Sequence, residues 1–218
     1  MNLIITNKHL KINKPIDGFE FYFLKKNDDF TKLKELLDNK RPEKIISLDF
    51  ALQTVNQIQD NSIIVAKETI SINAKPINWA VPREDRWIDT SEELNKSICD
   101  ILEKLAFQHY VGSGIELENA HSIIERSNAK KWISDNLHGT FIDGYSARLN
   151  EIIQENSINI SIIRIINSKF PIPDSKSKGF WSQSKRFLKE LYFYKIKAKS
   201  IKNEIIDKNL FYEFSKII

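Results

Sequence analysis

The stretch from Lys130 to Ser168 decides the fold, and it reads KKWISDNLHGTFIDGYSARLNEIIQENSINISIIRIINS. Its first part has helical periodicity and ends at Gly139, a residue type that commonly follows a helix. A short strand over 140–142 then runs into the turn Asp-Gly-Tyr-Ser. A second amphipathic helix follows, and the β-branched run Ile160–Ile166 predicts a buried strand. Alternation of helices with strands is typical of α/β proteins.

The rest of the chain continues this alternation. Thr90 followed by Glu93 predicts an N-cap with a capping box. The periodicity predicts strands at Leu3–Thr6, Phe19–Leu24, Lys44–Phe50, Ser62–Ala66 and His109–Ile115, and helices at Asp29–Asn39, Ser91–Ala106 and Lys130–Leu137. The chain has 218 residues, of which 41% are hydrophobic, enough for one well-buried core. We therefore expect a single domain over residues 1–218, with a three-layer α/β/α architecture and a central mixed sheet.

Residues 176–218 form a basic helical C-terminal segment, with 11 Lys and Arg against 4 Asp and Glu. Lysine-rich stretches can contact nucleic acid, but this one lacks recognition motifs, so a solvated helix face is favoured over a nucleic-acid partner. An apolar stripe is formed by Phe187, Leu191, Tyr194, Ala198, Ile201 and Ile205. Such a long stripe predicts two helices that pack on the core, or one helix that packs along a second subunit in a homodimer.

Several classes of protein and site are not expected. No apolar run approaches the roughly 18 residues of a membrane span, and the apolar part of the N-terminus is short for a signal peptide, so we expect a cytoplasmic protein without a membrane partner. The single cysteine, Cys99, allows no internal disulfide and no cysteine-rich zinc site. The four histidines show no metal-ligand spacing, and neither a nucleophile elbow nor a P-loop is present. We expect no metal and no cofactor.

The turn Asp143-Gly144-Tyr145-Ser146 and the run Arg164–Ser168 resemble motifs of the purine nucleoside phosphorylase and nucleosidase superfamily. In that family a lysine-bearing helix precedes a strand that ends in an acidic Met-Glu motif, and the next strand ends in Arg-Val-Val-Ser-Asp or a similar run. The resemblance implies a nucleoside phosphorylase-like fold. It also places Tyr145 at the position of the ribose-binding glutamate and Ser168 at that of the catalytic aspartate.

The resemblance extends upstream and covers most of residues 1 to 170. Ile45–Ala66 parallels a family segment with the pattern Gly-x-Ala-Gly-Gly-Leu followed by Gly-Asp, of which only Ala51 is retained. Gly112–Ile115 resembles a Ser-Gly-Asp segment near the base pocket, and Leu117 stands where a base-stacking aromatic residue is often found. The resemblance implies a purine nucleoside site lined by Ala51, Ser113, Leu117, Asp143 and Tyr145.

Two hypotheses about function follow. Cleavage of an N-glycosidic bond needs an acid to protonate the leaving base and a carboxylate to hold the ribose hydroxyls. Ser168 is too weakly acidic for the first role, and Tyr145 carries no negative charge for the second. The first hypothesis is a nucleoside phosphorylase- or nucleosidase-like protein that acts on the N-glycosidic bond of a purine nucleoside, with the family carboxylates replaced. The alternative is a catalytically lapsed nucleoside-binding or interaction protein on the same scaffold. Ser168 and Asp174 are the catalytic candidates, since the Asp174 loop could reach back to the site, although loop carboxylates are usually only solvated.

The other acidic residues have ordinary interpretations. Asp143 precedes an amphipathic helix and suits an N-cap, whereas Asp49 and Asp60 suit a strand end and a turn. The first turn, Thr6–His9, contains no glycine, and without glycine a backbone nest for phosphate is difficult to form. We therefore expect no bound phosphate in this turn and no phosphate dependence of any nucleoside cleavage.

Overall fold

A computed structural model describes residues 2–10, 18–24, 30–54, 58–72, 80–117, 128–171 and 180–217, except for the side chains of 180–183, 185 and 186. The strands are β1 (Asn2–Asn7), β2 (Phe19–Leu24), β3 (Lys44–Gln53), β4 (Ile63–Ser71), β5 (Ile88–Asp89), β6 (His109–Glu116), β7 (Phe141–Asp143) and β8 (Asn159–Ile166). The helices are α1 (Thr31–Lys40), α2 (Glu92–Lys104), α4 (Ala129–Leu137), α5 (Ser146–Glu155), α6 (Phe180–Tyr192), α7 (Lys199–Asp207) and α8 (Leu210–Phe214), with a π-helical turn at Phe193–Lys197.

The eight strands form one mixed sheet. Its order is β2-β1-β3-β7-β6-β4-β5, and β8 pairs with both β3 and β4. The β3–β8, β4–β6 and β6–β7 pairs are parallel, whereas β4–β8 and β3–β7 are antiparallel. These five pairings make a closed circuit through β3, β8, β4, β6 and β7. Side chains that point to the same side of these strands therefore meet, although the strands are far apart in sequence.

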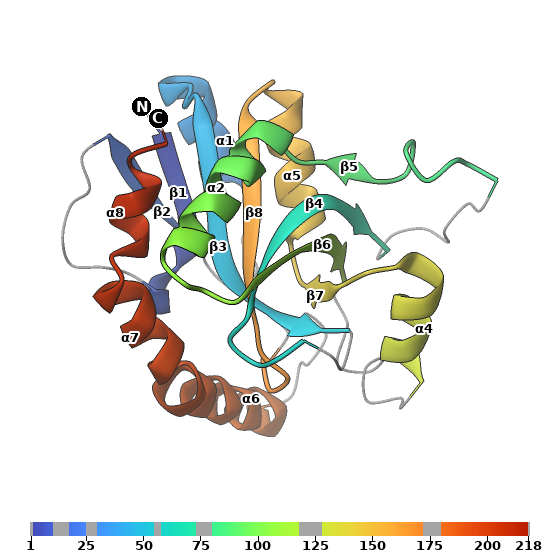
Figure 1. The fold of residues 1–218 in the computed structure, drawn as a ribbon. Coiled ribbons are helices and arrows are strands. Elements are labelled where there is room, and N and C mark those ends of the chain that lie inside the picture. Colours follow the sequence, from blue (N-terminus) through green and yellow to red (C-terminus); the bar gives the residue numbers. More distant parts are fainter. Residues whose placement is uncertain are drawn as a thin grey trace.

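Helices cover both faces of the sheet, as the alternation predicted (Figure 1). On one face, α2 and the C-terminal helices pack on a core that includes Leu48, Phe50 and Ile163. On the opposite face, α1 and α5 pack on a core that includes Ile45 and Ile162. A smaller cluster lies beneath α4. The predicted α/β fold with a central mixed sheet is confirmed.

Strand β8 contains a charged residue, Arg164, within an otherwise mostly apolar buried sequence. Its sequence, NISIIRII, is buried at every position after Asn159. β-Branched residues suit a strand that is covered on both faces. Arg164 interrupts this apolar run and is fully buried, so the protein must supply its polar partners internally.

Two predictions of detail need correction. Ser91, rather than Thr90, is the N-cap of α2, and its hydroxyl accepts a hydrogen bond from the Leu94 amide. The Thr90 hydroxyl is instead buried and donates to the Ala66 carbonyl at 2.6 Å. In the C-terminal stripe, Ala198, Ile201 and Ile205 are buried as predicted. Phe187 is 62% exposed, however, because α6 lies at the rim of the molecule.

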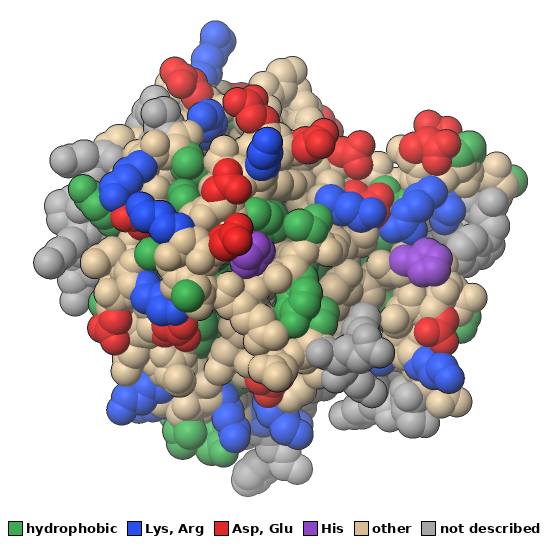
Figure 2. All heavy atoms as spheres, viewed as in Figure 1, with side chains coloured by type: hydrophobic (Ala, Val, Ile, Leu, Met, Phe, Trp, Pro, Cys, Tyr) green, Lys and Arg blue, Asp and Glu red, His purple; other side chains and the backbone are tan. Residues whose placement is uncertain are grey.

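The rim over α6 differs from the rest of the visible surface. On the face shown in Figure 2, acidic and basic side chains are interspersed over the upper half, and basic and hydrophobic side chains lie along the lower edge. Among the described side chains of α6 and the π-helical turn that follows it, the exposed large hydrophobic ones are Phe187, Leu188, Tyr192 and Ile196. Among the described residues, no helix has the length and apolar character that crossing a membrane requires.

The close contact between β6 and β7 gives a stability prediction. A Cβ added at Gly114 would lie 2.4 Å from Cζ of Phe141, whose side chain is fully buried. We expect Gly114→Ala to lower the free energy of unfolding by about 1–3 kcal/mol, the range for overpacked cores. Val111→Ala on the same strand, where the side chain is 59% exposed, is the control and should be nearly neutral in urea titrations. Equal stability of the two variants would contradict this packing.

Candidate functional site

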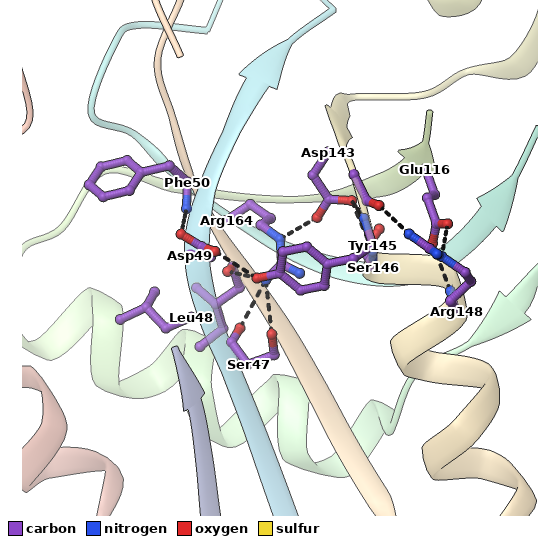
Figure 3. A network of polar contacts seen from close by, with 12 residues as sticks. Ser47, Leu48, Asp49, Phe50, Glu116, Asp143, Tyr145, Ser146, Arg148 and Arg164 are labelled. Atoms are coloured by element: carbon purple, nitrogen blue, oxygen red, sulfur yellow. Dashed lines mark hydrogen bonds and ion pairs between the residues drawn. The ribbon is translucent and has the colours of Figure 1, made fainter. Parts of the chain in front are cut away.

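Arg164 lies at the centre of a buried polar network (Figure 3). From β8 its Nε donates to Asp143 Oδ2 of β7 at 2.6 Å. Its Nη1 donates to the carbonyl and the hydroxyl of Ser47 on β3, at 3.2 and 3.1 Å, and to the Ile163 carbonyl at 2.9 Å. One guanidinium thus connects three strands of the closed circuit.

Asp143 joins this network to helix α5. Its Oδ1 accepts from the backbone amides of Tyr145 at 3.2 Å and Ser146 at 2.9 Å. These amides lie at the N-terminus of α5, where a negative charge is favourable. The N-cap residue of α5 is Tyr145 and not Asp143, as the sequence suggested, but the Asp143 carboxylate binds the first amides of the helix. These contacts also fix the start of α5 relative to Arg164.

Tyr145 reaches from the start of α5 to β3. Its hydroxyl donates to Asp49 Oδ2 at 2.8 Å, and the Phe50 amide donates to Asp49 Oδ1 at 2.7 Å. The Tyr145 ring centroid lies 4.9 Å from Cζ of Arg164 and 6.5 Å from the ring of Phe30. Tyr145 therefore contacts both the acidic and the basic centre of the network.

Burial changes the proton affinity of this pair. Desolvation raises the pKa of Asp49 to about 6, although the nearby Arg164 charge acts in the opposite direction. Desolvation also raises the pKa of Tyr145 well above its usual range. The Tyr145 hydroxyl consequently keeps its proton and acts as a donor to Asp49.

Glu116 is a second buried acid on the same side of the sheet. It is the register partner of Asp143 across β6 and β7, and it is fully buried. Arg148 of α5 donates to it through its backbone amide at 2.7 Å and its Nε at 2.5 Å. Desolvation raises the pKa of Glu116 to about 7, because it outweighs these stabilising contacts.

Ser168 lies two residues beyond the end of β8 and contacts an acidic side chain. Its backbone amide donates to Asp60 Oδ1 at 2.6 Å, and its hydroxyl donates to Asp60 Oδ2 at 2.9 Å. Asp60 comes from the turn before β4. A carboxylate thus lies against the hydroxyl at the position where the resemblance implies a catalytic aspartate.

The remaining predicted site residues are placed differently. Ala51 lies on the β3 face that also carries Asp49 and packs in the core beneath α5. Leu117 packs in the cluster beneath α4, and Ser113 donates to Glu68 Oε1 at 2.6 Å. Alternation along β6 directs both of these side chains away from Glu116. Asp174 lies outside the described residues.

Sequence reasoning missed Asp49, Glu116 and Arg164 as members of one network. A signal for two of them was present, since Asp49 in IISLDFALQ and Arg164 in ISIIRII are single charges in apolar strand segments. A charge in such a segment must be paired or hydrogen-bonded when it is buried. Glu116 follows a mixed segment and gives a weaker signal.

The turn after β1 is filled by the C-terminal segment. Asn7 Nδ2 donates to the Tyr194 hydroxyl at 3.0 Å, and the Asn7 Oδ1 accepts from the His9 amide at 3.0 Å. The His9 and Tyr194 rings are stacked, with centroids 3.9 Å apart. Polar groups of this turn are thus bound to the protein's own side chains.

In the described part of the chain, no cluster of three or more His, Cys, Asp or Glu side chains has a geometry suited to a metal ion.

Solved structures of nucleosidases share this fold. A futalosine hydrolase mutant of Helicobacter pylori strain 26695 aligns with a TM-score of 0.68 and 11% identity, covering 100% of this chain and 99% of that one. The 5′-methylthioadenosine/S-adenosylhomocysteine nucleosidase of Helicobacter pylori aligns with a TM-score of 0.65 and 12% identity, covering 95% and 97%. That of Campylobacter jejuni aligns with a TM-score of 0.65 and 10% identity, covering 100% and 99%.

The sequence itself matches no family model and no curated protein. The structural neighbours are members of the nucleoside phosphorylase and nucleosidase superfamily, so the resemblance seen in the sequence is confirmed at the level of the fold.

The two raised pKa values give a pH-dependent stability. Asp49 and Glu116 bind protons more tightly in the folded chain than in the unfolded chain, so their contribution to stability is present at low pH and is lost as pH rises. We expect the free energy of unfolding to fall by about 4 kcal/mol between pH 5 and pH 7.5 through these two groups. Urea titrations at both pH values measure this change.

The matched control is the double variant Asp49→Asn and Glu116→Gln. It removes both titrating groups and should remove most of the difference between the two pH values. The same dependence in the wild-type and double-variant proteins would assign the effect to other residues.

Proposed function

We propose that the chain is a nucleoside-binding protein on a nucleosidase scaffold, which binds a purine nucleoside at the ends of β3, β7 and β8 and does not cleave its N-glycosidic bond at an enzymatic rate. The fold supports this site, since the neighbours with the same fold are a futalosine hydrolase and 5′-methylthioadenosine/S-adenosylhomocysteine nucleosidases. Ligand sites in open α/β sheets are commonly found at strand ends.

One observation carries the proposal. The hydroxyls at the two positions where the resemblance implies carboxylates are both engaged as donors, Tyr145 to Asp49 and Ser168 to Asp60. Neither hydroxyl can supply the acid that protonates a leaving base, because serine and tyrosine are far too weakly acidic at neutral pH. Hydrogen-bonding capacity for a ligand is retained in this region by the buried Asp49 and Arg164.

A specific contact favours a second candidate function. Asp60, held by both the amide and the hydroxyl of Ser168, could act as the acid of a hydrolytic nucleosidase. Both of its carboxylate oxygens, however, already accept hydrogen bonds from Ser168. For this reason we prefer binding without turnover.

The turn after β1 bears on the choice between water and phosphate as nucleophile. Its Asn7 and His9 groups contact Tyr194, and the turn contains no glycine. A phosphate site needs free backbone amides that converge on the anion. This arrangement supports the expectation that phosphate stimulates no cleavage.

The test uses the purified wild-type chain with adenosine, inosine and methylthioadenosine. We expect calorimetry to detect binding, and chromatography to detect no release of free base above a protein-free blank, with or without phosphate. General acid catalysis typically contributes about 10²- to 10⁴-fold, so its loss brings the rate close to background. Ser168→Asp and Tyr145→Glu together are expected to release base once Asp60→Asn removes the carboxylate that would face the new aspartate.

Asp60→Asn distinguishes the two candidate functions. Wild-type base release that this substitution abolishes would establish the hydrolase and contradict binding without turnover. Absence of binding for all three nucleosides would remove the proposed ligand class.

A further inference from the structure

One nitrogen of Arg164 has no hydrogen-bond partner in the part of the chain that the structure describes. Its Nε and Nη1 are paired with Asp143, Ser47 and Ile163. Its Nη2 is buried and has no hydrogen-bond partner among the described residues. An unpaired buried donor is costly, and each such group in a native protein requires an explanation.

The Tyr145 ring lies across this guanidinium, as Figure 3 shows. Arg164 is fully buried and Asp49 is 5% exposed, whereas Tyr145 is only partly buried. Tyr145 therefore contacts both charged groups and is the most exposed of the three residues. Its hydroxyl already donates to Asp49 Oδ2 at 2.8 Å.

The two charged groups select one kind of ligand atom. Asp49 accepts a hydrogen bond, whereas Arg164 Nη2 donates one. A carboxylate would be repelled by Asp49, and an ammonium group by Arg164. A carbonyl oxygen has no proton to donate. A hydroxyl both donates and accepts, and so it satisfies both groups.

We propose that Asp49 and Arg164 form a binding site for a sugar hydroxyl, and that the phenol of Tyr145 occupies this site when no ligand is bound. The identity of the sugar as the ribose of a nucleoside rests on the proposed function, whereas the hydroxyl site itself does not. A ligand must displace Tyr145 to reach the pair. The apparent affinity of the wild-type chain therefore equals the intrinsic affinity of the open site multiplied by the fraction of molecules in which Tyr145 is displaced.

The first experiment tests the site without a nucleoside. Tyr145→Ala removes the internal phenol, and free phenol is then added to the folded variant. We expect phenol to raise its melting temperature and to leave that of the wild type unchanged. Anisole has the same ring but no hydroxyl proton, and it should have no such effect. Adding Asp49→Asn to Tyr145→Ala should abolish the phenol response.

The second experiment tests the ligand. We expect Tyr145→Ala to bind adenosine about tenfold more tightly than the wild type, because no side chain must be displaced. Tyr145→Phe keeps the covering ring and should show no such gain. 2′,3′-Dideoxyadenosine lacks the 2′- and 3′-hydroxyls of the ribose and should lose most of the improvement.

A measurement on the wild-type protein covers the case in which Tyr145→Ala does not fold. Saturating adenosine should increase nitration of Tyr145 by tetranitromethane, since displacement exposes the ring. Tyr212, which is 57% exposed, is the internal reference and should not change. Unchanged or reduced nitration of Tyr145 with adenosine bound would overturn the displacement.

The outcomes separate this inference from the proposed function. A phenol response in Tyr145→Ala without adenosine binding in any variant would leave the hydroxyl site standing and remove the nucleoside. Adenosine binding that is equal in the wild type and Tyr145→Ala, with equal responses to phenol and anisole, would overturn the hydroxyl site and leave nucleoside binding standing.

Discussion

The burial of the Arg164 guanidinium constrains the rest of the structure. A cation without solvent must be compensated by internal groups, and removal of one partner of a buried ion pair commonly costs about 3–5 kcal/mol. Here the partners come from β3, β7 and β8. The hydrogen bonds of Arg164 therefore fix the relative positions of these three strands. The Asp143 carboxylate also binds the Ser146 amide and so fixes the start of α5 relative to them.

The closed circuit of strand pairings makes this compensation possible. β7 has only three residues, yet it pairs with β3 on one side and β6 on the other. This arrangement brings Asp143 beside Glu116 and within reach of Arg164. The buried acids gain little net stability from such pairs, since desolvation offsets the attraction. Their contribution is to select one arrangement of the strand ends, where a ligand would bind.

The sequence predicted the fold better than the site, and the reason is physical. Strands such as Lys44–Phe50 and Ile160–Ile166 are recognisable because β-branched periodicity is a local property. The partners of Arg164 depend on pairings between segments about 20 to 120 residues apart, which no local pattern encodes. The position of Asp143 beside the start of α5 was accessible because helix-start signals are local, although the N-cap itself is Tyr145. The contact between Tyr145 and Asp49, in contrast, follows only from the closed circuit.

The two hydroxyl–carboxylate pairs couple Ser168 and Tyr145 to acidic neighbours, Asp60 and Asp49. A hydroxyl and a carboxylate bind each other, whereas two ionised carboxylates at the same distance repel. An aspartate at position 168 would face Asp60, and a glutamate at position 145 would face Asp49. At position 145 a compensating donor is at hand, since Arg164 Nη2, which has no hydrogen-bond partner among the described residues, can donate to a glutamate there. At position 168 no such donor is present in the described network. We therefore expect Ser168→Asp to act as an acid only when Asp60→Asn removes the carboxylate that it would face. Energetic coupling between contacting residues is commonly about 0.5–3 kcal/mol, which is enough to hide a restored acid when its new neighbour is left in place.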